Sequence, residues 1–178
     1  MMRGGMIKKP LVLLACAALS GCGLQPLYSS AGDASVAQNL AAVEVAEIQG
    51  QAGWLVRNAI TDKLSATGND SPRYRLDIRL DDALQGLGVL GDDTISRERR
   101  TLRARYQLID TQSGAILLDS TAGADAGIDV VSSEFATIAA EQRALENLAN
   151  EVADRIVTRV ALTLRSNQGN PPPTAAVE

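Results

Sequence analysis

The stretch RYRLDIRLD (residues 73–81) has the clearest pattern in the chain, because aromatic or aliphatic residues alternate strictly with charged ones. Successive side chains of a β-strand point to opposite faces, so this alternation predicts a strand with one buried face and one hydrated face. The buried face would carry Tyr74, Leu76, Ile78 and Leu80. The hydrated face would carry only arginine and aspartate side chains.

Two further alternating runs follow this strand. The glycine-containing segment over residues 84–93 predicts a flexible hairpin connection. The next strand would bury Leu102, Ala104, Tyr106 and Leu108. The turn sequence DTQSG (residues 110–114) then leads into a third strand over residues 115–126. This strand would bury Ile116, Leu118, Ala122 and Ala124.

Two other segments have helical periodicity instead. Residues 54–66 place their apolar side chains on one side, which predicts an amphipathic helix. Ser132 or Ser133 can cap a second, longer helix that continues to about residue 164. Its apolar stripe contains Ile138, Leu145, Leu148, Ala149, Val152, Ile156 and Val160.

A short alternating run at residues 41–48, ended by Gly50 and Gly53, predicts one more strand before the first helix. The resulting order is strand, helix, three strands, helix. It predicts an α+β fold, a two-layer sandwich with two helices packed on one face of a mainly antiparallel four-stranded sheet (β-α-β-β-β-α).

The N-terminus has the layout of a secretory signal. Basic residues precede an apolar run over residues 11–19, and Leu19-Ser20-Gly21-Cys22 closes it. This run is well short of the ~20 residues that a membrane-spanning helix needs. Its end resembles the lipobox of bacterial lipoproteins, which implies that residues 1–21 are removed and Cys22 is lipidated. Three acyl chains would make a stable membrane anchor.

The residue after the cysteine bears on the destination. Gly23 stands there, where lipoproteins retained at the inner membrane commonly carry Asp. Resemblance to sorted lipoproteins therefore favours the outer membrane, facing the periplasm, with the inner membrane as the alternative. We expect residues 22–39 to be a lipidated tether, residues 40–165 a single domain, and the proline-containing residues 166–178 a disordered tail.

Composition excludes several classes of function. Removing residues 1–21 takes away three of the 17 basic residues and none of the 21 acidic ones, which leaves a net charge of −7. Nucleic acid is therefore not an expected partner. The chain has no histidine, and Lys63 is its only lysine beyond the signal, near no obvious nucleophile. We accordingly expect no enzyme activity, no metal site and no cofactor.

One group of residues has a charge pattern that suggests binding. Arginines recur at odd-numbered positions of two successive long strands, so on each strand they point to the same face. They are Arg73, Arg75 and Arg79 on the first strand, and Arg97, Arg99, Arg103 and Arg105 on the next. If the strands pair, seven guanidinium groups lie on the face opposite the helices. Guanidinium binds phosphate in a bidentate manner. The alternative is a hydrated surface partly neutralised by Asp77, Asp81 and Asp119.

Several short sequences occur in a familiar order. They are CGLQPLY (22–28), LVRNAI (55–60), a YxLxI strand (74–78), YQLID (106–110) before a Ser-Gly turn, SEFA (133–136) and RVAL (159–162). Their order resembles that of the lipopolysaccharide-assembly lipoproteins of the LptE type, over about residues 22–165. Leu24 stands where an aromatic residue is usual in that family, and Phe135 where tyrosine is frequent.

The resemblance implies a non-enzymatic role at the outer membrane. Proteins of this type sit inside the lumen of an LptD-type β-barrel as its plug and folding partner, and help to deliver lipopolysaccharide to the outer leaflet. Lipid A carries phosphates, so the seven arginines become candidate lipopolysaccharide contacts. The alternative is an auxiliary periplasmic lipoprotein of an ABC-type lipid transport system, which can share the lipobox, size and α/β content.

Overall fold

The sheet is built from one short strand and three long ones. The computed structural model describes residues 31–65, 72–89 and 95–169. Strand β1 covers Val43–Val45, β2 Tyr74–Val89, β3 Ile95–Asp110 and β4 Ile116–Asp129, and they lie in the order β1-β2-β3-β4. β1 is parallel to β2, and the other two pairs are antiparallel. The predicted mainly antiparallel four-stranded sheet is therefore confirmed.

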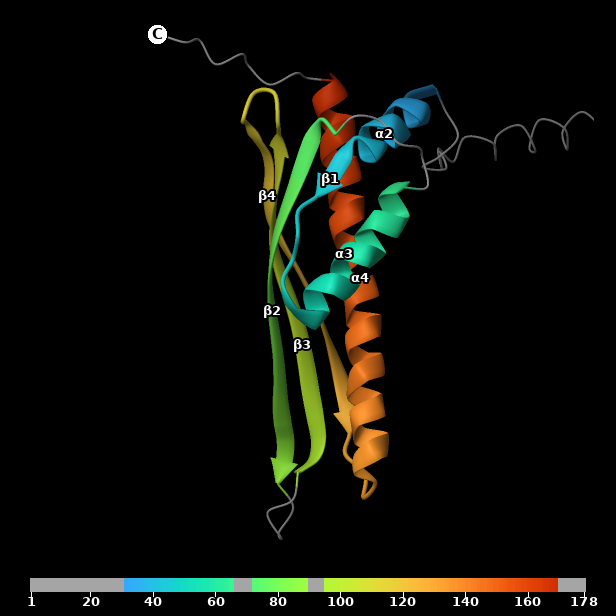
Figure 1. Ribbon diagram of the computed structural model, residues 1–178, viewed down its shortest axis with the longest axis vertical. Helices are drawn as coiled ribbons and strands as arrows, with labels where there is room; N and C mark the ends of the chain where they lie inside the picture. The colour runs from blue at the N-terminus through green and yellow to red at the C-terminus, as the bar shows by residue number, and fades with distance from the viewer. Residues whose placement is uncertain (1–30, 66–71, 90–94, 170–178) are drawn as a thin grey trace, which may run out of the picture. The chain divides into compact units, whose positions relative to one another are not determined.

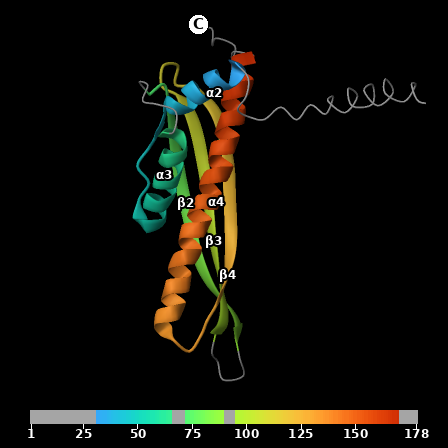
Figure 2. The same cartoon turned by 90° about the vertical axis from the view of Figure 1, so that its right-hand side faces the viewer.

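Two helices cover one face of this sheet (Figures 1 and 2). Helix α3 (Gly50–Ser65) contacts β1 and β2, whereas α4 (Glu134–Gly169) contacts β3, β4 and α3. The predicted two-layer α+β architecture is thus confirmed.

The core lies between these two layers. Leu76, Leu102 and Leu108 from the sheet are almost fully buried, as are Ile60 of α3 and Ile156 of α4. All belong to one hydrophobic cluster, which shows that the alternating strands and the helical stripe bury against each other. The predicted buried faces of β2 and β3 are confirmed, with Leu80 only half-buried.

The turn between β3 and β4 is also confirmed. The Asp110 carboxylate accepts hydrogen bonds from the backbone N–H groups of Gln112 and Ser113, at 2.9 and 3.1 Å. Gly114 has φ of 70°, a left-handed conformation in which a glycine costs little. The N–H of Asp110 in turn donates to the carbonyl of Ala115 and closes the loop.

Several predicted boundaries were wrong. β1 is only Val43–Val45, because the chain leaves the sheet after Ala46 and α3 already begins at Gly50, with φ of 82°. The predicted connection over residues 84–93 is largely strand: β2 continues to Val89 and β3 begins at Ile95, since the cross-strand ladder extends through Gly86. The rest of that connection lies outside the described residues.

The predicted tether and tail also contain helix. Helix α2 covers Ala31–Ala41, and its alanine-rich sequence AGDASVAQNLA favours helix despite its turn-prone polar residues. From Ser35 onward the chain belongs to one compact unit with the sheet. At the other end, α4 continues to Gly169 and not only to about residue 164, because no proline interrupts it before residue 171.

Two predicted core residues are exposed. Ile116 has 57% of its surface accessible, because an irregularity near Leu117 shifts the register and turns Ile116 to the face that carries Ile109. Ile138 is 55% exposed in the first turns of α4, where the helix stripe becomes buried only from Ala144 onward.

Candidate functional site

The side of the sheet opposite the helices, which we call the outer face, gathers most of the predicted arginines. Arg79 lies directly across from Arg105, and Asp81 from Arg103. Arg75 shares their parity on β2, as do Arg97 and Arg99 on β3, and all are exposed or nearly so. Arg73 stands just before β2 at one end of this row.

Most of these arginines are neutralised by aspartates. Arg75 binds Asp77 at 2.7 Å, and Arg105 binds Asp119 at 3.0 Å. Two further pairs join β3 to β4 on this face: Arg97–Asp129 at 3.0 Å and Arg99–Asp125 at 3.9 Å. The sequence-based alternative of a partly neutralised surface therefore describes much of this face, since β4 supplies three of the four aspartates.

The hydrogen bonds of these pairs favour the charged forms. The hydrogen bond from Arg75 holds the pKa of Asp77 below its usual value, and its charge reinforces this. Hydrogen bonds from Arg105 and Gln107 likewise lower the pKa of Asp119. The same contacts raise the pKa of Arg75 and of Arg105. These pairs therefore stay ionised at neutral pH.

Arg73 has a separate environment at the end of the sheet. Its guanidinium lies 3.4 Å from the Asp110 carboxylate and 5.2 Å from the centre of the Tyr74 ring. Burial alone would raise the pKa of Asp110. The hydrogen bonds from the N–H groups of Ser113 and Gln112 and the charge of Arg73 lower it by more, so the pKa lies below its usual value. Arg73 thus stabilises the Asp110 turn and is set apart from the rest of the row.

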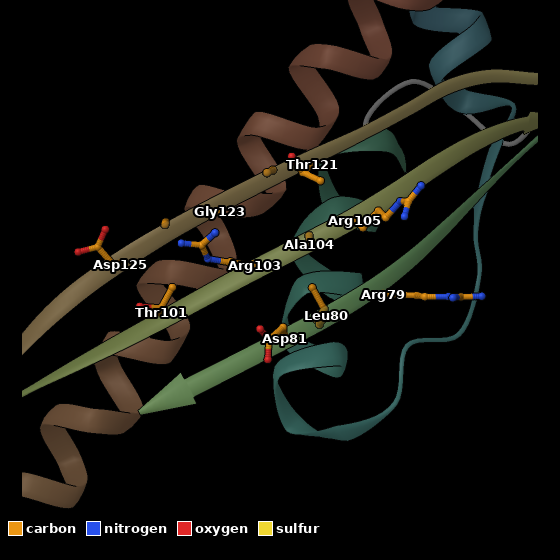
Figure 3. A pocket seen from close by; sticks show the side chains of 12 residues that line it. Arg79, Leu80, Asp81, Thr101, Arg103, Ala104, Arg105, Thr121, Gly123 and Asp125 are labelled. Carbon is orange, nitrogen blue, oxygen red and sulfur yellow. The ribbon is translucent and has the colours of Figure 1, made fainter. Parts of the chain in front are cut away.

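Arg79 and Arg103 are the two members of the set that form no ion pair within the described part of the chain. Both line an open depression of about 580 Å³ in the outer face, together with Arg105. Figure 3 shows Arg103 between β3 and β4 beside Gly123, and Arg79 projecting from β2 away from β3. A Cβ on Gly123 would lie 3.3 Å from Cγ of Arg103, so the glycine leaves room for this side chain.

One charged cluster was not anticipated from the sequence. Arg100 lies on the helix side of β3 and binds the Asp82 carboxylate in a bidentate manner, at 2.9 and 2.7 Å. Its remaining nitrogen donates to the carbonyl of Glu141 in α4, at 3.2 Å. The hydrogen bonds that Arg100 donates to Asp82 raise the pKa of Arg100 against the effect of burial. The sequence contained a signal for this cluster. Arg100 and Asp82 are even-numbered, like the buried residues of their strands, so the alternation places both charges on the helix side of the sheet.

The described residues form neither a metal site nor a membrane-spanning helix. Among the described residues, no three acidic, histidine or cysteine side chains gather as they would around a metal ion. In the same residues, no helix has the length and apolar character needed to cross a membrane. The predicted signal, the lipobox and Cys22 lie outside the described residues.

Solved structures with the same fold come from several bacteria. A lipoprotein of Caulobacter crescentus CB15 is 23% identical with a TM-score of 0.62, over 74% of this chain and 96% of that one. A minor lipoprotein of Acinetobacter baumannii is 15% identical with a TM-score of 0.53, over 67% and 91%. Rare lipoprotein B of Shewanella oneidensis is 12% identical with a TM-score of 0.51, over 71% and 96%. At these identities the likeness shows the fold alone.

Sequence comparison assigns the family. No curated protein has a significant sequence match to this chain. The model of the LptE family, described as lipopolysaccharide-assembly, matches residues 40–160, which include the whole sheet and most of α4. The family is one of non-enzymatic assembly lipoproteins, in agreement with the resemblance seen in the sequence motifs. The chain therefore belongs to the LptE lipopolysaccharide-assembly family.

Proposed function

We propose that this protein is a lipid-anchored plug and assembly partner of an LptD-type β-barrel in the outer membrane, and that it aids delivery of lipopolysaccharide to the outer leaflet. The observation that carries the proposal is the family match over residues 40–160. It also favours this role over that of an auxiliary lipoprotein of an ABC-type transport system.

The outer face of the sheet supports the plug role. None of the described helices packs on this face, yet its ion pairs leave little net charge along β3 and β4. The lumen of a large outer-membrane barrel is polar and hydrated. A surface of mostly paired arginines and aspartates is compatible with such a lumen, because it does not require burial of apolar area.

Purification of the native complex tests the plug role. We expect the full-length lipoprotein, tagged at its C-terminus and extracted from its own membranes in mild detergent, to bring an LptD-type barrel with it in about equal amount. The control is an equally tagged outer-membrane lipoprotein of another family. Recovery of the lipoprotein without any such barrel would contradict the proposal.

For contact with lipopolysaccharide, the unpaired arginines are the strongest candidates. Arg79 and Arg103 can bind a lipid A phosphate without first leaving an aspartate, whereas Arg97 and Arg99 must give up Asp129 and Asp125. The paired arginines and Arg73 remain secondary candidates. Exposed charges are screened over about 8–10 Å at physiological ionic strength, so binding should weaken as salt rises.

We expect the double variant Arg79→Gln, Arg103→Gln to bind lipopolysaccharide on the order of tenfold more weakly than wild type, because two charge-assisted contacts are lost. The matched control is Arg97→Gln, Arg99→Gln, which removes the same charge from the same face of the sheet. Titration of the purified lipoprotein with lipopolysaccharide at two salt concentrations measures the effect. Equal loss in both variants would mean that net charge matters and not these two positions.

A further inference from the structure

Strand β4 forms an open edge of the sheet. It is 14 residues long, its partner on one side is β3, and no described strand lies on its other side. No backbone hydrogen bond from a loop or helix of the described chain fills this edge between Leu117 and Asp129. An unpaired strand of this length is a template for another extended chain.

The pairing pattern shows which backbone groups are free. On β2, Tyr74 donates to Ala42 and Leu76 accepts from Ala46, so even-numbered residues there point their backbone groups toward β1. Odd-numbered residues of β2 therefore bond to odd-numbered residues of β3, and even-numbered residues of β3 bond to even-numbered residues of β4. The odd-numbered residues of β4 from Asp119 to Asp129 must then point their N–H and C=O groups outward.

A contact at the edge agrees with this assignment. The carbonyl of Gly123, an odd-numbered residue, accepts a hydrogen bond from the Arg155 guanidinium of α4. Arg155 also contacts the Glu151 carboxylate at 2.5 Å, so it has a second partner when it leaves this carbonyl. Arg155 thus occupies one acceptor in the middle of an otherwise unfilled row.

The β4 edge lacks the usual protection against pairing. Natural edge strands are commonly guarded by inward-pointing charges, lysines or prolines. From Leu118 to Ile128 the six helix-facing residues of β4 are uncharged, three of them are alanine, and the strand has no lysine or proline. Its outward aspartates are neutralised by Arg97, Arg99 and Arg105. The free edge of β2 differs, because Asp82 is an inward-pointing charge there.

The helix beside the β4 edge offers side-chain contacts. Arg155, Arg159 and Leu162 share one face of α4 and line an open hollow of about 390 Å³. Thr158 and Asp154 complete the lining, and the Asp154 carboxylate is already paired with Lys63 at 2.7 Å. Leu162 is 47% exposed, and Arg159 has no ion pair within the described residues. The segment from Arg155 to Gly169 has three arginines and no acidic residue. An added strand with an apolar and an acidic side chain on this side would complement the hollow.

We propose that the β4 edge binds an extended segment of the barrel partner by β-strand addition, with that segment lying along α4 at Arg159 and Leu162. The inference rests on the proposed function for the identity of the partner. A closed barrel has no free edge among its own strands, so the segment comes from a loop or terminal region of the barrel protein. An acidic segment fits better than a second copy of this chain, because the aspartates on the β4 edge of a second copy are already paired with Arg97, Arg99 and Arg105.

Residue-resolved amide hydrogen exchange of the full-length lipoprotein, in detergent alone and in the purified complex, tests the proposal. In the lipoprotein alone, the amides of Thr121, Gly123, Asp125 and Gly127 should exchange much faster than those of their even-numbered neighbours. In the complex they should slow on the order of tenfold or more, because they become hydrogen-bonded. Unchanged exchange at these amides in an intact complex overturns the proposal and leaves the proposed function standing.

Proline substitution provides a second measurement. Thr121→Pro and Gly127→Pro remove outward N–H groups without removing a bond to β3, and each should weaken association with the barrel by roughly fivefold. Thr121→Ala and Gly127→Ala keep the N–H groups and should bind as wild type; at Gly127 nothing lies within 4 Å of an added Cβ. If the proline variants do not fold, Thr121→Lys replaces them, since a lysine guards an edge.

The remaining outcomes are also decisive. Failure to recover any complex with wild type overturns the proposed function, and this inference with it. Protection of the odd-numbered amides in the lipoprotein alone, together with dimer formation, would show that a second copy occupies the edge. Undiminished association of a folded proline or lysine variant would show that strand addition does not contribute to binding.

Discussion

Replacing Ile156 with Asp is expected to unfold the domain. Ile156 is completely buried in the middle of α4 and belongs to the cluster that joins the helices to the sheet. A carboxylate at this position would have no partner, and burying it costs several kcal/mol. Because a domain of this kind has a total stability of roughly 5–15 kcal/mol, the loss removes much or all of it.

Thermal and urea unfolding followed by circular dichroism measure this effect. Thr158→Asp is the matched control, because it introduces the same side chain on an exposed position of the same helix. Leu148→Asp should behave like Ile156→Asp, since Leu148 is buried in the same cluster. Melting of the Ile156→Asp variant at the wild-type temperature would contradict the packing of α4 on the sheet.

Replacing Cys22 with Ala is expected to abolish lipidation and to release the protein from its membrane while leaving the domain folded. Among the described residues the core begins at Ala42, 20 positions after Cys22 in the chain. Loss of all acyl chains removes an anchor that two chains already make stable. The fold needs no covalent link to residue 22, so circular dichroism of the variant should match that of the processed wild type.

Cell fractionation and mass spectrometry of the purified protein report this result. Cys16→Ala is the matched control, because Cys16 lies in the segment that we expect to be removed and the variant should be lipidated normally. Fractionation should be repeated in cells depleted of the proposed barrel partner, since the proposed plug role would give the protein a second attachment. Membrane retention of the unlipidated variant in those cells would count against Cys22 as the anchor.

The sequence by itself determined the layers of this protein. Alternation in residues 73–81 placed Leu76 and Ile78 toward the helices and Arg75 and Arg79 away from them, and the structure agrees. The stripe of α4 from Leu145 to Val160 was equally clear. Both follow from periodicity, since the direction of a side chain in a strand or helix is set by the local backbone. The turn at Asp110 and Gly114 was readable for the same reason, because its residues act on neighbouring backbone.

Only the tertiary structure decided what depends on cross-strand register. The irregularity near Leu117 exposes Ile116, although the residue continues an apolar alternation in sequence. The strands extend through the glycines near Gly86, because ladder partners on β3 compensate for their weak local preference for strand.

The candidate site shows the same division. The sequence placed the arginines on one face, but it could not show that Arg97 and Arg99 meet Asp129 and Asp125 while Arg79 and Arg103 form no ion pair with any described residue. Nor could it show that β4 is an edge with its odd-numbered backbone groups outward. These properties depend on which residues of distant strands lie opposite each other. Such pairing is fixed by the assembled sheet, where the residues that meet are about 26 to 32 positions apart in the chain.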